Sequence, residues 1–112
     1  MSSISTHILD THRGCPASDV RIELRQLTDA GVQVISEGRT NEDGRLPGLS
    51  PEGGLQPGSY QMFFATKDYH ASLGIQGFYP YVEVTFEITE TAQHYHVPLL
   101  ISPFGFSTYR GS

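Results

Sequence analysis

The chain has 112 residues, of which 38% are hydrophobic and 17% are charged, and its formal net charge is −5 at pH 7. This length suits one domain with a single core, so we predict one domain over residues 1–112. The composition excludes a disordered chain. The acidic balance argues against a nucleic-acid partner, because no basic patch is available to neutralise phosphates. No apolar run approaches the ~20 residues that cross a bilayer, which argues against a membrane partner.

Three features lead us to expect a cytoplasmic protein. The N-terminus lacks the basic start and apolar stretch of a signal peptide. The C-terminus lacks a peroxisomal address of the Ser-Lys-Leu type. The single cysteine, Cys15, cannot form an internal disulfide, which fits a reducing compartment.

Alternation of apolar and polar residues with period two dominates the chain and predicts strands. It is clearest at residues 20–25 and at residues 81–88, where Val82, Val84, Phe86 and Ile88 fall on one face. β-Branched and aromatic residues indicate strands elsewhere as well. In chain order, the predicted strands cover residues 5–10, 20–25, 32–40, 59–66, 81–88, 95–102 and 106–110.

Turn-forming residues separate these segments, as in the Asn-Glu-Asp-Gly sequence at residues 41–44. One short helix is expected at residues 68–73, with Gly74 at its C-terminal end. Short strands at this spacing predict an all-β fold, a sandwich of two antiparallel sheets with about eight strands. The helix would be a connection between strands.

Five histidines in so short a chain suggest a functional site. His94 and His96 are two residues apart in a predicted strand, so their side chains point to the same face. Together with His7 in the first strand, they have the ligand types for zinc. For each histidine alone, a solvated imidazole on a sheet face is the simpler interpretation.

Other candidate residues have equally simple structural interpretations. Arg45, which follows the turn at residues 41–44, fits a solvated surface charge. Cys15 lies between Gly14 and Pro16 with no aligned base to activate it. His70 is expected on the surface of the helix. The last residues of a chain normally fray.

Three segments together resemble one known family. The first is STHILDT at residues 5–11, followed by GCPA at residues 14–17, and the second is TNEDGR at residues 40–45. The third runs from HYHVPLLISP at residues 94–103 through FGFST to the final YRGS. These segments resemble the 5-hydroxyisourate hydrolases of the transthyretin-like family over essentially the whole chain. The C-terminal segment is the most specific, because transthyretin itself, a hormone carrier, lacks this histidine pattern and this ending.

The resemblance implies an eight-stranded sandwich that assembles as a homotetramer, a dimer of dimers, with active sites where the dimers meet. It implies hydrolysis of 5-hydroxyisourate to 2-oxo-4-hydroxy-4-carboxy-5-ureidoimidazoline in urate degradation, without metal or cofactor. The implied catalytic residues are His7, Arg45 and His96. The implied substrate-binding residues are His7, Arg45, Tyr109, Arg110, Gly111 and Ser112.

In this interpretation the two imidazoles share the proton transfers, and the guanidinium stabilises the oxygen that gains charge. Tyr81 stands where relatives often have an acidic residue, and Phe104 and Phe106 occupy the last hairpin; we expect these differences to affect packing or substrate fit. Two alternatives remain open from the residues alone. One is a transthyretin-like carrier that binds an aromatic ligand without converting it. The other is a zinc protein that uses His7, His94 and His96.

Overall fold

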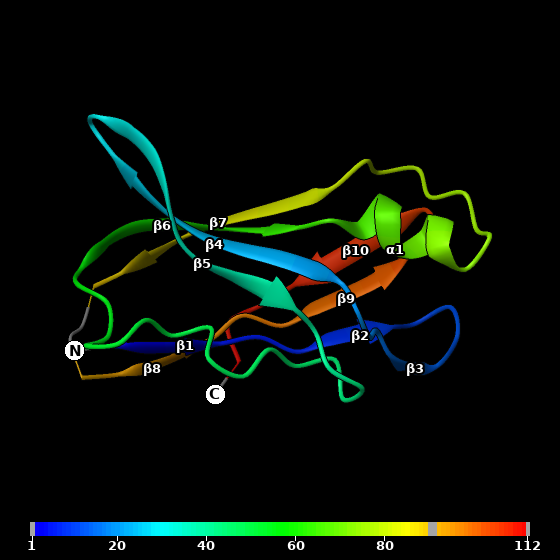
Figure 1. The fold of residues 1–112 in the computed structure, drawn as a ribbon, viewed down its shortest axis with the longest axis horizontal. Coiled ribbons are helices and arrows are strands. Elements are labelled where there is room, and N and C mark those ends of the chain that lie inside the picture. Colours follow the sequence, from blue (N-terminus) through cyan, green and yellow to red (C-terminus); the bar gives the residue numbers. More distant parts are fainter. Residues whose placement is uncertain (1, 90–91, 112) are drawn as a thin grey trace.

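Two four-stranded β-sheets make up most of the molecule (Figure 1). The structure is a computed structural model that describes residues 2–89 and 92–111. In chain order, its elements are β1 (Ser3–Ser5), β2 (Ile8–Asp10), β3 (Cys15–Pro16), β4 (Arg21–Thr28), β5 (Gly31–Arg39), β6 (Gly58–Phe64), α1 (Thr66–Ser72), β7 (Val82–Ile88), β8 (His94–His96), β9 (Leu99–Ser102) and β10 (Gly105–Thr108).

The two sheets differ in how their strands pair. One has the order β5-β4-β6-β7 and is antiparallel throughout. The other has the order β10-β9-β2-β3, in which β2 and β9 run parallel, and β1 and β8 form a separate parallel pair. The predicted all-β sandwich with one short helix is confirmed. Not every strand pair in the sandwich is antiparallel. The whole first sheet lies between β2 and β9 in the chain, and this long connection allows the two strands to run parallel.

Alternating side chains from both sheets meet in the core. Ile22, Leu24 and Met62 of the first sheet are fully buried, and Ile8 and Leu99 of the second sheet face them from the other side. Alternate residues of a strand point to opposite faces, so the period-two pattern predicted these inward positions. Burying each such side chain contributes about 1.5–3 kcal/mol relative to leaving it exposed.

β7 carries the predicted alternation but buries only its two ends. Val82 and Ile88 are buried, whereas Val84 and Phe86 are half-buried. A cavity of about 250 Å³ opens beside these two half-buried side chains. The shared face predicted for the four residues is confirmed, and the open space explains why its middle is incompletely covered.

Two strands that the sequence pattern predicted as continuous are each interrupted, β1 from β2 and β8 from β9. Pro98 has no N–H with which to continue a ladder. The hydroxyl of Thr6 donates a hydrogen bond to the carbonyl of Val97 at 2.7 Å. The amide of Leu99 donates to the carbonyl of His7 at 3.0 Å, so the two interruptions lie side by side.

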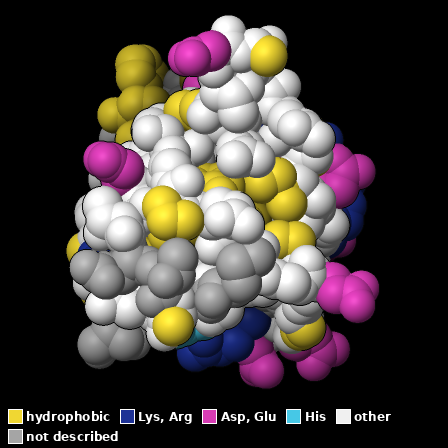
Figure 2. Space-filling view, turned by 90° about the vertical axis from the view of Figure 1, so that its left-hand side faces the viewer, with side chains coloured by type: hydrophobic (Ala, Val, Ile, Leu, Met, Phe, Trp, Pro, Cys, Tyr) yellow, Lys and Arg dark blue, Asp and Glu magenta, His cyan; other side chains and the backbone are white. Residues whose placement is uncertain are grey.

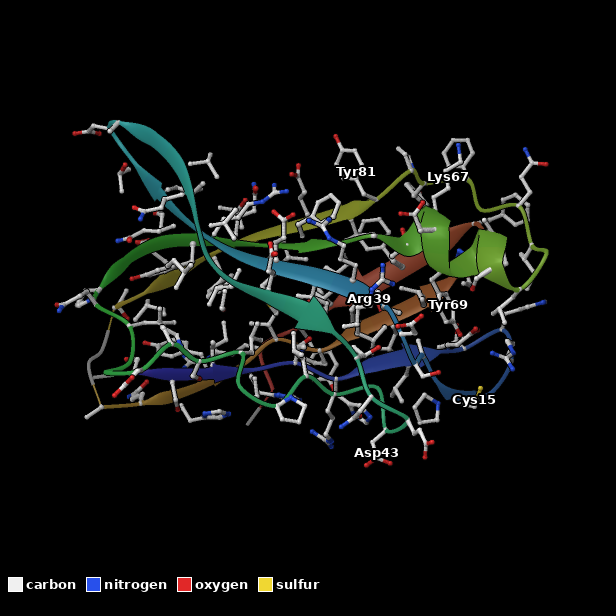
Figure 3. All side chains as sticks on the ribbon, in the orientation of Figure 1. Cys15, Arg39, Asp43, Lys67, Tyr69 and Tyr81 are labelled. Atoms are coloured by element: carbon white, nitrogen blue, oxygen red, sulfur yellow. The ribbon has the colours of Figure 1, made fainter. Side chains whose placement is uncertain are left out.

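The helix α1 covers one end of the sandwich and begins at Thr66, earlier than predicted. The hydroxyl of Tyr69 donates to Oδ2 of Asp10 at 2.7 Å, and Figure 3 shows this side chain pointing from the helix toward β2. His70 is only 3% exposed. The expectation that His70 lies on the surface is therefore wrong, because the helix packs this residue against the end of the sandwich. No helix among the described residues is long and apolar enough to cross a membrane.

Candidate active site

The interruption between β1 and β2 presents His7 beside β8. Ser5 pairs with His96 in the parallel register of β1 and β8. Along this segment Ser3, Ser5 and His7 are half-buried, whereas the intervening residues are buried. Because side chains alternate between faces, His7 lies on the same face as Ser5 and therefore near His96.

A hydrogen-bonded turn brings Arg45 to the same region. Oδ1 of Asn41 accepts hydrogen bonds from the amides of Asp43 and Arg45 at 2.9 and 3.1 Å. The carbonyl of Gly44 accepts from the amide of Ile8 at 2.8 Å, which attaches the turn next to the residue that follows His7. Asp43 lies at the outer tip of this turn (Figure 3).

Gly44 is required for this attachment. Its φ is +76°, and a Cβ at this position would lie 2.4 Å from the carbonyl oxygen of Ile8. Only glycine allows both the left-handed conformation and the close approach to β2. The Asp-Gly pair, which the sequence marked only as a turn, therefore also fixes the position of Arg45.

The charges of the other candidate residues affect the pKa of His96. Burial lowers the pKa of its imidazole below 6.5, and the charge of Arg45 lowers it further. His94 and His7 act in the same direction, while a hydrogen bond to the backbone of Ser5 opposes them. The structure thus brings His7, Arg45 and His96 together and favours a neutral imidazole at position 96 near pH 7.

The two ring nitrogens of His96 differ in their contacts within the described residues. Nδ1 lies 2.8 Å from Oγ of Ser5. Nε2 makes no hydrogen bond within residues 2–89 and 92–111, nor do the side chains of His7 and Arg45. These groups can therefore bind a ligand without breaking existing interactions.

The C-terminal tail is held against His96 as far as Gly111. The amide of Gly111 donates to the carbonyl of His96 at 2.8 Å. A Cβ on Gly111 would lie 2.5 Å from Cδ2 of the His96 ring, so the backbone of Gly111 lies close against the imidazole. Ser112, which the resemblance assigns to substrate binding, lies outside the described residues.

Tyr109 and Arg110 lie on the other side of β8. The guanidinium of Arg110 stacks 4.5 Å from the ring centroid of Tyr95 and donates to Oε1 of Gln93 at 3.1 Å. Tyr109, Arg110 and Tyr95 line the cavity beside β7. On a single chain these two tail residues thus contact neighbours away from His96, and their predicted role in substrate binding stays a prediction.

The histidines are not arranged to hold a metal. Both ring nitrogens of His94 face serine hydroxyls, with Nδ1 at 2.6 Å from Ser3 and Nε2 at 2.7 Å from Ser5. Within the described part of the chain, no group of three His, Cys, Asp or Glu side chains has the arrangement of a metal site. Cys15 lies in the β2–β3 hairpin (Figure 3) and is half-buried.

Sequence reasoning missed the serines of β1. Ser3 and Ser5 contact His94, and Ser5 also contacts His96. The available signal was the period-two spacing of Ser3, Ser5 and His7, which places all three on the face that carries the histidines.

One end of the molecule combines polar and apolar surface. Figure 2 shows acidic side chains around the edge of this face and hydrophobic side chains nearer its centre. Basic side chains lie at the lower edge of the same face, so its edge carries charges of both signs.

Comparison with known proteins defines the class of this fold and site. The model of the HIUase/Transthyretin family matches residues 4–111, and the chain therefore belongs to this family. The 5-hydroxyisourate hydrolase of Mus musculus is 47% identical over 114 residues, which cover 99% of this chain and 96% of the mouse protein. The resemblance based on the three motifs is confirmed.

Solved structures show that a 5-hydroxyisourate hydrolase and a transthyretin share this fold. The Klebsiella pneumoniae 5-hydroxyisourate hydrolase has a TM-score of 0.88 at 34% identity, with 100% of this chain and 94% of that chain covered. Transthyretin from Sparus aurata has a TM-score of 0.92 at 32% identity, with 97% of this chain and 96% of that chain covered. The fold alone therefore does not separate catalysis from binding, and the site residues must do so.

Proposed function

We propose that this chain hydrolyses 5-hydroxyisourate to 2-oxo-4-hydroxy-4-carboxy-5-ureidoimidazoline in urate degradation. The observation that carries the proposal is the electrostatic cluster of His7, Arg45 and His96. A carrier needs no such combination of two imidazoles and a guanidinium. The name of the mouse relative, 47% identical over almost the whole chain, supports the same activity.

The reaction requires water to attack a carbonyl carbon and an acyl–nitrogen bond to break. Nε2 of His96 takes a proton from the attacking water, because Nδ1 faces Ser5 and is already engaged. The lowered pKa of His96 favours the neutral ring near neutral pH, and Nε2 is the free base when the ring hydrogen is on Nδ1. His7 supports the second transfer, in which the leaving nitrogen receives a proton, and the carbonyl carbon ends as a carboxylate.

Arg45 stabilises negative charge and does not transfer a proton. Its guanidinium is always protonated and presents planar donors suited to a carbonyl or a delocalised anion. Facing the oxygen that becomes negative at the tetrahedral stage, it stabilises the transition state more than the ground state. It also supplies positive charge that a chain of net charge −5 otherwise lacks for an anionic substrate.

A homotetramer, a dimer of dimers, would complete these sites, and the cytoplasm is its proposed location. Arg45 is exposed on the single chain, so another subunit is needed to exclude water from the reacting groups. Phe104 and Phe106, 75% and 43% exposed, provide apolar surface for such contacts. Within the described residues each of the two four-stranded sheets has two edge strands, β3 and β10 in one and β5 and β7 in the other, which leaves edges for association.

A direct assay tests the proposed activity. 5-Hydroxyisourate is generated freshly from urate with a uricase, this protein is added, and the ultraviolet absorbance is followed. The substrate decays spontaneously, so the expected result is a decay rate that rises in proportion to protein concentration. Unchanged decay, with saturable binding of the same compound, would contradict the proposal and favour a carrier.

A further inference from the structure

A serine hydroxyl lies between two imidazoles beside the proposed site. Oγ of Ser5 is 2.7 Å from Nε2 of His94 and 2.8 Å from Nδ1 of His96. The other nitrogen of His94, Nδ1, is 2.6 Å from Oγ of Ser3. The four side chains therefore form one continuous hydrogen-bonded row that ends at His96.

Strand pairing builds this row. Ser3 lies opposite His94 and Ser5 lies opposite His96 in the parallel register of β1 and β8. Residues two apart on a strand share a face, so both serines and both histidines point the same way. Ile4, between the serines, is buried on the opposite face and fixes the pair of strands to the core.

The row constrains where protons can be. A serine hydroxyl has one hydrogen and two lone pairs, so Ser5 donates to no more than one of the two imidazoles and accepts from at least one. The relay uses the arrangement in which Ser5 donates to one imidazole and accepts from the other. When Ser5 accepts from Nδ1–H of His96, Nε2 of His96 is a free base. When Ser5 donates to Nδ1, Nε2 carries the hydrogen and is an acid. The direction of the row thus selects the tautomer of His96.

We propose that Ser5 and His94 are positioning residues that set the tautomer of His96 and relay a proton between its Nδ1 and solvent. In one proton transfer along the row, Nε2 of His96 takes a proton from water, and Nδ1 of His96 passes its own hydrogen to Ser5. Ser5 passes its hydrogen to Nε2 of His94, and His94 releases its Nδ1 hydrogen through Ser3. One proton enters at His96 and one leaves at the exposed end, so the row is neutral before and after.

This inference rests on the proposed hydrolysis and predicts a specific kinetic pattern. Ser5→Ala should lower kcat by about 10- to 100-fold, the usual scale for losing a group that orients a catalytic one, with little change in KM. Ser5→Thr keeps the hydroxyl and should restore most of kcat. Ser59→Ala removes an exposed serine from β6 in the other sheet and is the matched control.

The pH dependence separates a relay from a structural role. The groups that face His96 are Arg45 from the turn, His7 from the strand interruption and His94 from β8. Ser5→Ala removes an acceptor for the protonated imidazole, so the acid limb of kcat should move to lower pH. His94→Asn removes a neighbour that disfavours protonation, so the acid limb should move to higher pH.

The closing experiment combines these profiles with ¹⁵N NMR of the His96 ring in substrate-free protein. We expect one dominant, hydrogen-bonded tautomer in the wild-type chain and averaged nitrogen shifts in Ser5→Ala. An active wild-type chain whose Ser5→Ala variant keeps kcat, pH profile and tautomer would overturn the relay alone. A wild-type chain that does not accelerate decay of 5-hydroxyisourate would contradict the proposed function, and the relay's role with it.

Discussion

At the scale of single residues, reactivity depends on the charge around one imidazole. His96 combines burial, which disfavours its protonated form, with the neighbouring guanidinium of Arg45. The ring is also held by Ser5 at Nδ1 and by the backbone of Gly111, which lies close against it. The sequence identified His7, Arg45 and His96 by resemblance, but their proximity depends on contacts between distant segments that composition and spacing do not determine.

Replacing Arg45 should change the pH profile as well as the rate. Without this positive charge the pKa of His96 rises toward 6.5, so the base form is lost at a higher pH as the solution is acidified. We expect Arg45→Ala to lower kcat/KM by about 10²-fold or more and to move its acid limb to higher pH. Arg45→Lys, which keeps the charge, should retain the position of the limb. An acid limb of kcat/KM at the same pH in wild type and Arg45→Ala would argue against the electrostatic role.

Adding one methyl group at Gly111 should disturb the imidazole. The new Cβ would lie 2.5 Å from Cδ2 of His96, so the ring or the tail must move. We expect Gly111→Ala to lower kcat by about tenfold or more while the melting temperature stays close to that of wild type. Gly105→Ala is the control, because its Cβ would lie at an ordinary 3.6 Å from Oγ of Ser102. Equal activity in the two variants would show that the tail does not orient His96.

At the scale of elements, period-two patterning predicted the strands better than their interruptions. The alternation around Ile22 and Leu24 predicted the correct inward face of β4, where both side chains are fully buried. The pattern also continued through Thr6, which is buried like its neighbours Ile4 and Ile8. The alternation therefore gave no sign of the interruption after β1, where the hydroxyl of Thr6 donates a hydrogen bond to the carbonyl of Val97, which lies between β8 and β9.

The turn before Arg45 should depend on one glycine. Gly44→Ala forces a side chain into a left-handed conformation and into contact with the carbonyl of Ile8. We expect a loss of about 1–3 kcal/mol in the free energy of unfolding, together with reduced kcat/KM because Arg45 is displaced. Urea denaturation and the decay assay measure the two effects. Gly53→Ala, also in a left-handed conformation but with open space around its Cβ, controls for backbone strain alone. Equal losses in both variants would contradict the proposed attachment of the turn.

At the scale of the whole molecule, the all-β sandwich was predictable but the packing of its ends was not. The spacing of strands and turns indicated two sheets, whereas the burial of His70 depends on how α1 closes one end. Nδ1 and Nε2 of His70 have no hydrogen-bond partner among the described residues, and neither has Oγ1 of Thr66. The protein therefore carries a buried, neutral imidazole outside the proposed site.

This buried imidazole should make the fold sensitive to acid. Burial lowers the pKa of His70 below 6.5, an effect that His12 assists and Asp10 opposes. The unfolded chain, with its ordinary pKa, binds the proton more tightly, so the free energy of unfolding falls as the pH drops below about 6.5. We expect His70→Gln to show a smaller fall in melting temperature between pH 7.5 and pH 5.5 than wild type. His12→Gln removes an exposed neighbour that lowers the pKa of His70, so its fall should lie between those of wild type and His70→Gln. The same fall in all three proteins would exclude this role for His70.

The most direct test of a shared site is a double-mutant cycle measured as kcat/KM for 5-hydroxyisourate. His96→Asn and Arg45→Ala should each lower kcat/KM by about 10²-fold or more with the fold intact. Groups that act on the same reacting atoms are strongly non-additive, so the double variant should lose far less than the product of the two single losses. If the loss of kcat/KM in the double variant equals the product of the two single losses, or if either single variant has a near-normal rate, a common site would be contradicted.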